Sequence, residues 1–231
     1  IADENIDIDS ANNIVQNDEG IISSLNKLVI DVDKDITQNN NSLIQASRIE
    51  INGKSNSGEN ITQNKNSQII ADYLDIKTGN SQILIGNNRI DMFTAVNQGA
   101  GDIIFNNTSD KLIIPHIQKN LIGKININQK GILNINKIKA SQSKVNIHAA
   151  DSIYNHNSEL NVKAGAMDLY SADGQIGEDK LPLKVYLTGD KGRINARAGG
   201  SIYLESVKGN LLSDKINSVN GSVDLISREG N

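Results

Sequence analysis

The feature that most constrains the fold is a repeat near the start of the chain. Three matching Ile-x-Gln-Asn segments begin at Ile14, Ile36 and Ile61, so that one follows the next at intervals of roughly 22–25 residues. Each is followed by a short apolar pair and then by a strand-like alternation of apolar and polar residues. One turn of a parallel β-helix needs about this much chain, and each coil stacks on the next at about 4.8 Å. The repeat therefore predicts an all-β, right-handed parallel β-helix (β-solenoid) with about 22–25 residues per coil.

The composition agrees with short strands joined by tight turns. Ile and Asn are abundant, whereas aromatic residues make up 3% of the chain and Trp is absent. Ile is β-branched and suits a pleated surface, and Asn tolerates the left-handed backbone of tight turns. The alternative is a tandem array of β-sandwich modules. Such modules bury bulky aromatics between two sheets, so the low aromatic content favours the solenoid.

The alternation also predicts which side chains face the core. Leu28, Ile30 and Val32 are expected to point inward, and Asp31 and Asp33 outward. Equivalent inward residues of the next two coils should stack on them, namely Ile49, Ile51, Leu74 and Ile76. Two amide ladders are expected at the corners, one of Gln16, Gln38 and Gln63 and one of Asn17, Asn39 and Asn64. Otherwise these amides are solvated turn residues.

A longer repeat is superimposed on the short one. The segment that begins at Gly101 matches the one that begins at Gly200, at an offset of 99 residues, and Asn64 and its neighbours match Asn155 at an offset of 91. Residues 61–140 and 153–231 are thus predicted to be two copies of one module. Residues 1–231 as a whole are predicted to form one continuous solenoid segment of about ten coils, with a protruding loop at 178–183.

Charge and composition exclude several function classes. The net charge is −4 with both signs interspersed, which is no electrostatic footprint for nucleic acid. No apolar run approaches the roughly 20 residues of a membrane-spanning helix. The chain has no Cys, so disulfides and thiolate metal sites are excluded.

Residues that could carry chemistry are scattered along the chain. His116, His148 and His156 are far apart and lack metal-ligand spacing, so surface positions are expected for them. The Asp31-x-Asp33-x-Asp35 run lacks the following Gly and the distal Glu of a calcium loop. Glu50, Asp75, Asp168 and Glu205 are expected to be spread over many coils.

We therefore predict that the chain is not an enzyme and has no catalytic residue, cofactor or metal ligand. The sequence does not identify a ligand-binding residue. The alternative of a different class is a polysaccharide-binding or polysaccharide-degrading β-helix module. Such an enzyme would need paired carboxylates on one face, which stacking of coils can create from residues distant in sequence.

Two stretches resemble a known family. The pattern Ile14-x-x-Asn17-x-x-Gly20-x-Ile22 followed by a Leu-x-Ile strand, and the stretch from Ala164 to Leu169, are similar to repeats of filamentous-haemagglutinin-type bacterial exoproteins. This resemblance implies a secreted β-helical fibre on the bacterial cell surface, exported through an outer-membrane secretion partner. It further implies a virulence-related role in adhesion to host or neighbouring cells through a receptor or glycan, in biofilm formation, or as the stalk of a contact-dependent toxin-delivery protein.

Both ends of the sequence alternate like strands. Residues 1–8 and 223–227 show this pattern, with no capping helix or Pro-containing cap beside them. We therefore expect the β-helix to continue in both directions in a longer protein. Open strand edges at the cut ends should favour end-to-end self-association.

Overall fold

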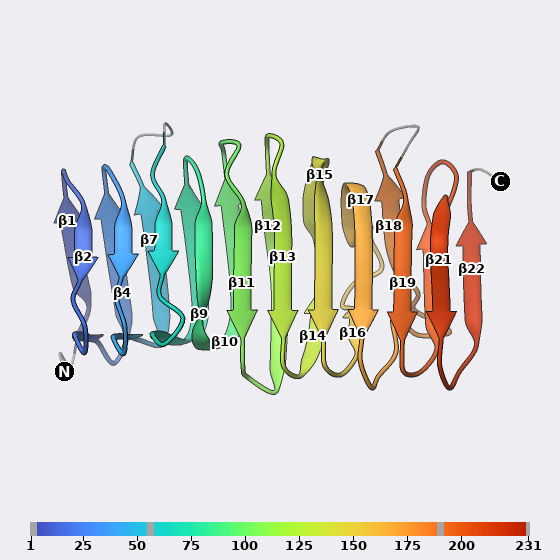
Figure 1. Ribbon diagram of the computed structural model, residues 1–231, viewed down its shortest axis with the longest axis horizontal. Coiled ribbons are helices and arrows are strands. Elements are labelled where there is room, and N and C mark those ends of the chain that lie inside the picture. The colour runs from blue at the N-terminus through green and yellow to red at the C-terminus, as the bar shows by residue number, and fades with distance from the viewer. Residues whose placement is uncertain (1–3, 55–57, 189–191, 230–231) are drawn as a thin grey trace.

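The computed structural model describes residues 4–54, 58–188 and 192–229. These residues form 22 strands and no helix, and every strand ladder among them is parallel. The coils lie side by side along one axis, with the two termini at opposite ends (Figure 1). The predicted β-solenoid is confirmed, with about ten coils, and pairing between strands one coil apart excludes the tandem β-sandwich. A coil contains about 21 residues, slightly fewer than the predicted 22–25.

Each coil contributes to three strand ladders. The first ladder contains β2 (Ile14–Gln16), β5 (Ile36–Gln38), β8 (Ile61–Gln63), the first part of β10 (Gln82–Asn97), β11 (Ile103–Asn107), β13 (Lys124–Gln129), the second parts of β15 (Ile138–Ala149) and β17 (Val162–Ser171), β19 (Ile194–Ala198) and β21 (Ser213–Ser218).

The second ladder contains β3 (Ile21–Ser23), β6 (Leu43–Gln45), the first part of β9 (Gln68–Thr78), the middle of β10, the first part of β12 (Lys111–Lys119), β14 (Ile132–Ile135), β16 (Ile153–Asn155) and the first residues of β20 (Ile202–Ser206) and β22 (Val223–Ser227). The third ladder contains β1 (Ile6–Ser10), β4 (Lys27–Val32), β7 (Arg48–Gly53), β18 (Leu183–Leu187), the first parts of β15 and β17, and the last parts of β9, β10, β12, β20 and β22.

The spacing of the first three coils follows the sequence repeat. Ile14 pairs with Ile36, and Ile36 pairs with Ile61, so each predicted repeat start lies directly on the one before it. Later steps on this ladder vary more widely. The step from Ile194 to Ser213 is short, and the longest step runs from Met167 to Ile194.

The longest step contains the predicted loop. Residues 178–180 are exposed, as expected for a protrusion. The loop is shorter than predicted, because Pro182 is buried and Leu183 begins β18 with a fully buried side chain. A strand on the third ladder requires an apolar residue at that point, and Leu183 supplies it.

The core is a continuous apolar column inside the coils. Leu28, Ile30 and Val32 are buried, and Ile49, Ile51, Leu74 and Ile76 stack on them in the predicted register. Asp31 and Asp33 are partly exposed, which confirms their outward direction. The register follows from the two-residue period of a strand, because a slip by one residue would expose every one of these apolar side chains.

A ladder of buried amides runs along one corner of the core. Gln16, Gln38 and Gln63 stack as predicted, and the Gln63 Nε2 donates a 3.0 Å hydrogen bond to the Oε1 of Gln38. The ladder continues through three more buried amide residues, Asn88, Asn107 and Gln129. The second predicted ladder differs, since Asn39 and Asn64 contact the preceding coil through their backbone N–H groups, which donate to the carbonyls of Gln16 and Gln38.

The segments matched by the longer repeat lie on different ladders. β11, which follows Gly101, belongs to the first ladder, whereas β20, which follows Gly200, begins on the second. From β11 the chain passes through four coils, marked by β13, β15, β17 and β19 on the first ladder. It then continues into β20, which begins on the next ladder. The module boundaries at 61–140 and 153–231 stay a prediction.

The terminal rungs pair on one side. β1 pairs with β4, and β22 pairs with β20. The strand predicted at residues 223–227 is β22, and the one predicted at residues 1–8 corresponds to β1, with residues 1–3 outside the described part of the chain. No helix in the described ranges has the length and apolar character needed to cross a membrane.

Candidate functional site

A long hollow of the surface lies along the first ladder. It has a volume of about 590 Å³ and crosses six consecutive strands from β11 to β21. We call it the trough. Its walls are two rows of outward side chains and its floor is Ile147, Leu169 and Ala196. The first row is Ile104, Asn126, Asn146, Asp168, Asn195 and Lys215, and the second row is Asn128, His148, Tyr170 and Arg197.

The rows exist because strands stack in register. Asn126 pairs with Asn146, Asn146 with Asp168, and Asp168 with Asn195. Side chains alternate along a strand, so the two rows are the outward residues two positions apart on the same strands. Successive members of a row are therefore one coil apart, at about 4.8 Å. The trough presents a linear, periodic set of polar groups along the axis of the rod.

The first row is tied together by hydrogen bonds. The Nδ2 of Asn146 donates to the Oδ1 of Asn126 at 2.6 Å, and the Nδ2 of Asn195 donates to the Oδ1 of Asp168 at 2.8 Å. Asp168 also forms an ion pair with Lys144. Desolvation opposes the charge of Asp168, but the hydrogen bonds from Lys144 and Asn195 outweigh it and hold the pKa of this carboxyl below its ordinary value. Asp168 is thus an ionised carboxylate whose charge is balanced by Lys144.

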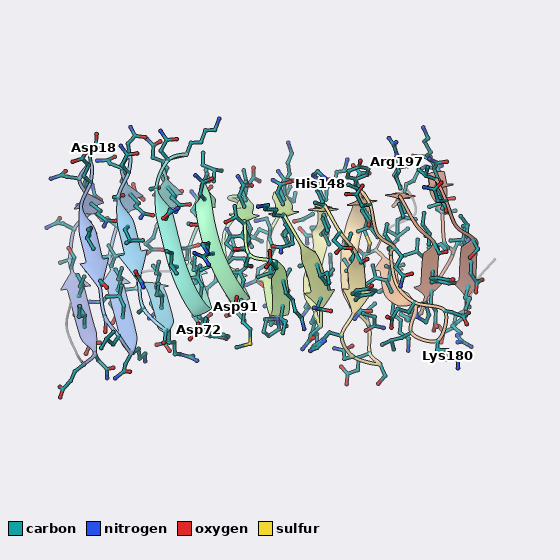
Figure 2. The ribbon with its side chains drawn as sticks, turned by 90° about the horizontal axis from the view of Figure 1, so that it is seen from below. Asp18, Asp72, Asp91, His148, Lys180 and Arg197 are labelled. Carbon is teal, nitrogen blue, oxygen red and sulfur yellow. The ribbon has the colours of Figure 1, made fainter. Side chains whose placement is uncertain are left out.

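Beyond Asn128, the second row places two aromatic rings and one guanidinium next to one another. The His148 and Tyr170 ring centroids are 4.6 Å apart at an interplanar angle of 59°. The guanidinium of Arg197 lies 5.7 Å from the Tyr170 ring centroid. His148 and Arg197 lie on the same side of the rod (Figure 2). Tyr170 thus has a neighbour in the same row on either side of its ring.

The three histidines do not come together. His148 lies on the first ladder, His116 on the third, and His156 follows β16 of the second. His148 and His156 are exposed and His116 is partly exposed, in agreement with the predicted surface positions. In the aspartate run, Asp31 accepts a hydrogen bond from Asn52 and Asp35 accepts two from Asn60. In the described part of the chain no three His, Asp or Glu side chains are grouped to hold a metal ion.

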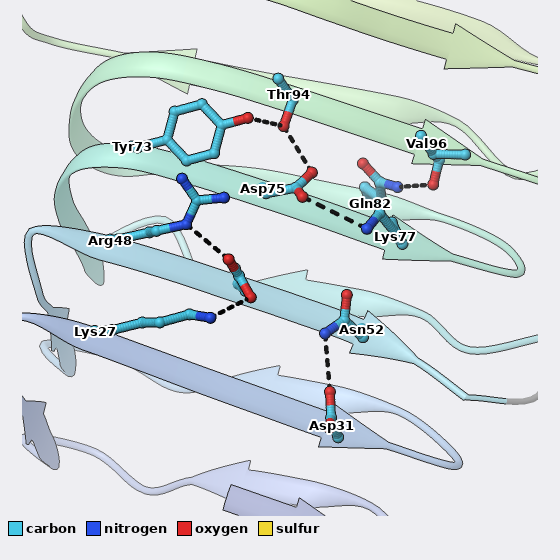
Figure 3. A network of polar contacts seen from close by, with 11 residues as sticks. Lys27, Asp31, Arg48, Asn52, Tyr73, Asp75, Lys77, Gln82, Thr94 and Val96 are labelled. Carbon is cyan, nitrogen blue, oxygen red and sulfur yellow. Dashed lines mark hydrogen bonds and ion pairs between the residues drawn. The ribbon is translucent and has the colours of Figure 1, made fainter. Parts of the chain in front are cut away.

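Stacking brings two of the four scattered carboxylates together. Glu50 and Asp75 occupy neighbouring coils of the third ladder, within the polar network drawn in Figure 3. Lys27 and Arg48 lie 2.8 and 2.7 Å from Glu50, respectively. Asp75 accepts a 2.6 Å hydrogen bond from Thr94. These contacts satisfy both carboxylates, so the network stabilises the coil stack.

The other two carboxylates remain apart, as the sequence predicted. Asp168 lies in the trough on the first ladder, and Glu205 lies on the third, where it is buried and paired with Arg228 at 2.9 Å. The Arg228 hydrogen bond is the main cause that lowers the pKa of Glu205.

Sequence reasoning missed the trough as a site. In the linear sequence His148 and Asp168 stand singly, without the neighbours that stacking gives them. The signal that could have found them is the recurrence of Asn126, Asn146, Asp168 and Asn195 at intervals of one coil. These intervals are unequal in length, and no recurring residue type marks the corners of these coils. The sequence alone therefore does not reveal the row.

Comparison with protein-family models, with curated proteins and with solved structures finds no match to this chain.

Proposed function

We propose that the chain is a structural and adhesive segment of a secreted bacterial surface fibre, which binds an extended glycan in the trough. The observation that carries the proposal is the pair of rows that lines the trough, the first over six stacked strands and the second over four. The resemblance of the repeats to filamentous-haemagglutinin-type exoproteins supports the secreted, surface-exposed part of this proposal.

The architecture suits a fibre. Each coil buries its apolar residues against its neighbours, so length can grow by adding coils without enlarging the core. The described coils form a rod roughly 50 Å long, from about ten coils at about 4.8 Å each. A rod of this kind holds a surface away from the cell and keeps its side chains at fixed spacing.

The trough suits a linear polymer. Its amide, imidazole, phenol and guanidinium groups can all form hydrogen bonds with hydroxyl groups, and they recur at the coil spacing along one line. An extended sugar chain laid along the rod would meet a new set of partners at each coil. The partner we propose is therefore a glycan of a host cell, a neighbouring bacterium or a biofilm matrix.

We propose that binding occurs without catalysis. Hydrolysis of a glycosidic bond generally uses two carboxyl groups that flank the bond. The residues that line the trough include one carboxylate, Asp168, and it is held by Lys144 and Asn195. Reducing ends released from a bound polysaccharide by the purified chain, and lost in Asp168→Asn, would support the depolymerase alternative.

Adhesion under flow tests the proposal. Beads coated with the chain should be retained on glycan-bearing cell layers, and periodate oxidation of the glycans should release them. The double variant Asn128→Ala/His148→Ala removes two exposed side chains from the trough. Its matched control is Asn64→Ala/His156→Ala, which removes the same residue types at exposed positions elsewhere. Retention should fall in the first variant alone. Equal retention by both variants, or retention that survives oxidation, would refute a glycan-binding trough.

A further inference from the structure

The two ends of the trough differ in charge. At the β11–β15 end the rows consist of Ile104, three asparagines and His148. At the β19–β21 end they finish in Arg197 and Lys215, which are both exposed. The cations therefore lie together at one end of the hollow, on adjacent coils.

Within the described part of the chain, these two cations have no counter-ion. Neither Arg197 nor Lys215 forms an ion pair with any described carboxylate. Their neighbours behave differently, since Arg193 pairs with Asp214 at 3.2 Å and Lys144 pairs with Asp168. The one acidic group of the trough is thus already neutralised, and the hollow keeps two positive charges.

The trough offers no flat aromatic platform. His148 and Arg197 lie beside the Tyr170 ring, 4.6 and 5.7 Å from its centroid. Nor does it offer free backbone groups to an extended peptide, because β15, β17 and β19 each pair with a strand on both sides. Recognition here must come from side-chain hydrogen bonds and charge.

We infer that the trough binds an acidic polysaccharide whose uronate carboxylates lie against Arg197 and Lys215. This inference rests on the proposed function and names its ligand class. The guanidinium fork of Arg197 matches a carboxylate in a bidentate geometry. Lys215 supplies a second charge on the next coil, about 4.8 Å further along the rod axis and in the other row of the trough. The asparagines and His148 then hold the hydroxyl groups of the neighbouring sugars.

Binding of oligogalacturonate to the 231-residue chain tests the inference. Calorimetry should show binding that weakens as salt increases. Arg197→Gln and Lys215→Gln should each weaken it by roughly tenfold, as expected for loss of one charge-assisted hydrogen bond. The carboxyl-reduced oligomer keeps the sugar backbone and loses the charge. It should bind the wild-type chain as weakly as oligogalacturonate binds the double variant Arg197→Gln/Lys215→Gln.

A matched control separates the site from general electrostatics. Lys139→Gln/Lys163→Gln removes the same two charges from the third ladder, outside the trough. This variant should bind like the wild type. Equal weakening by both double variants, equal binding of the carboxyl-reduced oligomer, or equal binding of poly-glutamate would overturn the inference. If the reduced oligomer binds equally well and Asn128→Ala/His148→Ala still abolishes binding, the glycan trough stands and its acidic specificity is wrong.

Discussion

The buried amide ladder should be essential to the coil stack, and Asn107→Ala tests this. Asn107 is 2% exposed, and its Oδ1 accepts a 2.8 Å hydrogen bond from the backbone N–H of Ile90. Its Nδ2 donates to the Oε1 of Gln129 at 2.9 Å and to the Ile90 carbonyl. Ser109 also donates to the Ile90 carbonyl, so this carbonyl keeps a partner in the variant.

The variant leaves two buried groups unsatisfied, the N–H of Ile90 and the Oε1 of Gln129. Each buried group without a partner costs about 1–3 kcal/mol, so the free energy of unfolding should fall by about 2–6 kcal/mol. That is a large share of the roughly 5–15 kcal/mol of a typical domain. Ala offers no compensating apolar gain.

Urea unfolding and amide hydrogen exchange measure the two parts of this effect. Exchange of the Ile90 N–H should accelerate at least about thirtyfold, which corresponds to about 2 kcal/mol. Asn106→Ala is the matched control, because Asn106 precedes Asn107 on the same strand and is partly exposed. It should change stability by no more than about 1 kcal/mol and leave the Ile90 exchange rate unaltered. If the two variants behave alike, the ladder is incidental to stability.

Three further outcomes are expected. Ile51→Asp should lower the free energy of unfolding by several kcal/mol, because it buries an unpaired charge. Asp31→Ser should cost no more than about 1 kcal/mol in the same urea titration. The reverse order of these two effects would mean that the register is inverted. Hydrogen bonds from its two cationic neighbours hold the pKa of Glu50 below its ordinary value, so its stabilising effect is present above about pH 4.3 and is lost as pH falls through the folded-state pKa. Glu50→Gln should therefore lower the Tm at neutral pH and not in strong acid, while the exposed control Glu159→Gln should change little at either pH. Far-ultraviolet circular dichroism should give a β-dominated spectrum, and a strong helical signal would contradict the fold.

The first coils could be predicted from the sequence because their corners repeat almost unchanged. Gln16, Gln38 and Gln63 each end a strand of the first ladder, so these three residues alone mark the register of their coils. Once these corners are aligned, strand alternation assigns the inward residues of the third ladder as far as Ile76. The core of this part of the chain is thus a direct consequence of sequence periodicity.

The later coils could not be aligned in the same way. After Gln129 the same corner is occupied by Ala149, Ser171 and then Ala198, which have no amide to mark it. The lengths of the coils also vary, because loops between the ladders absorb extra residues without disturbing the stack. The trough lies on these coils, so its two rows emerge only when the strand pairing is known.

The longer repeat has a physical consequence for where binding side chains lie. A segment that recurs after four coils and one further face keeps its inward residues in the core, since all three ladders enclose the same column. Its outward residues, however, move to the next ladder. Ile104 lines the trough, whereas Tyr203, which matches it at an offset of 99 residues, lies on β20 beside the second ladder. Duplication of such a segment therefore extends the rod without duplicating the trough. On a solenoid with such a repeat, each row of outward side chains would therefore arise separately, from the coils that stack at that place.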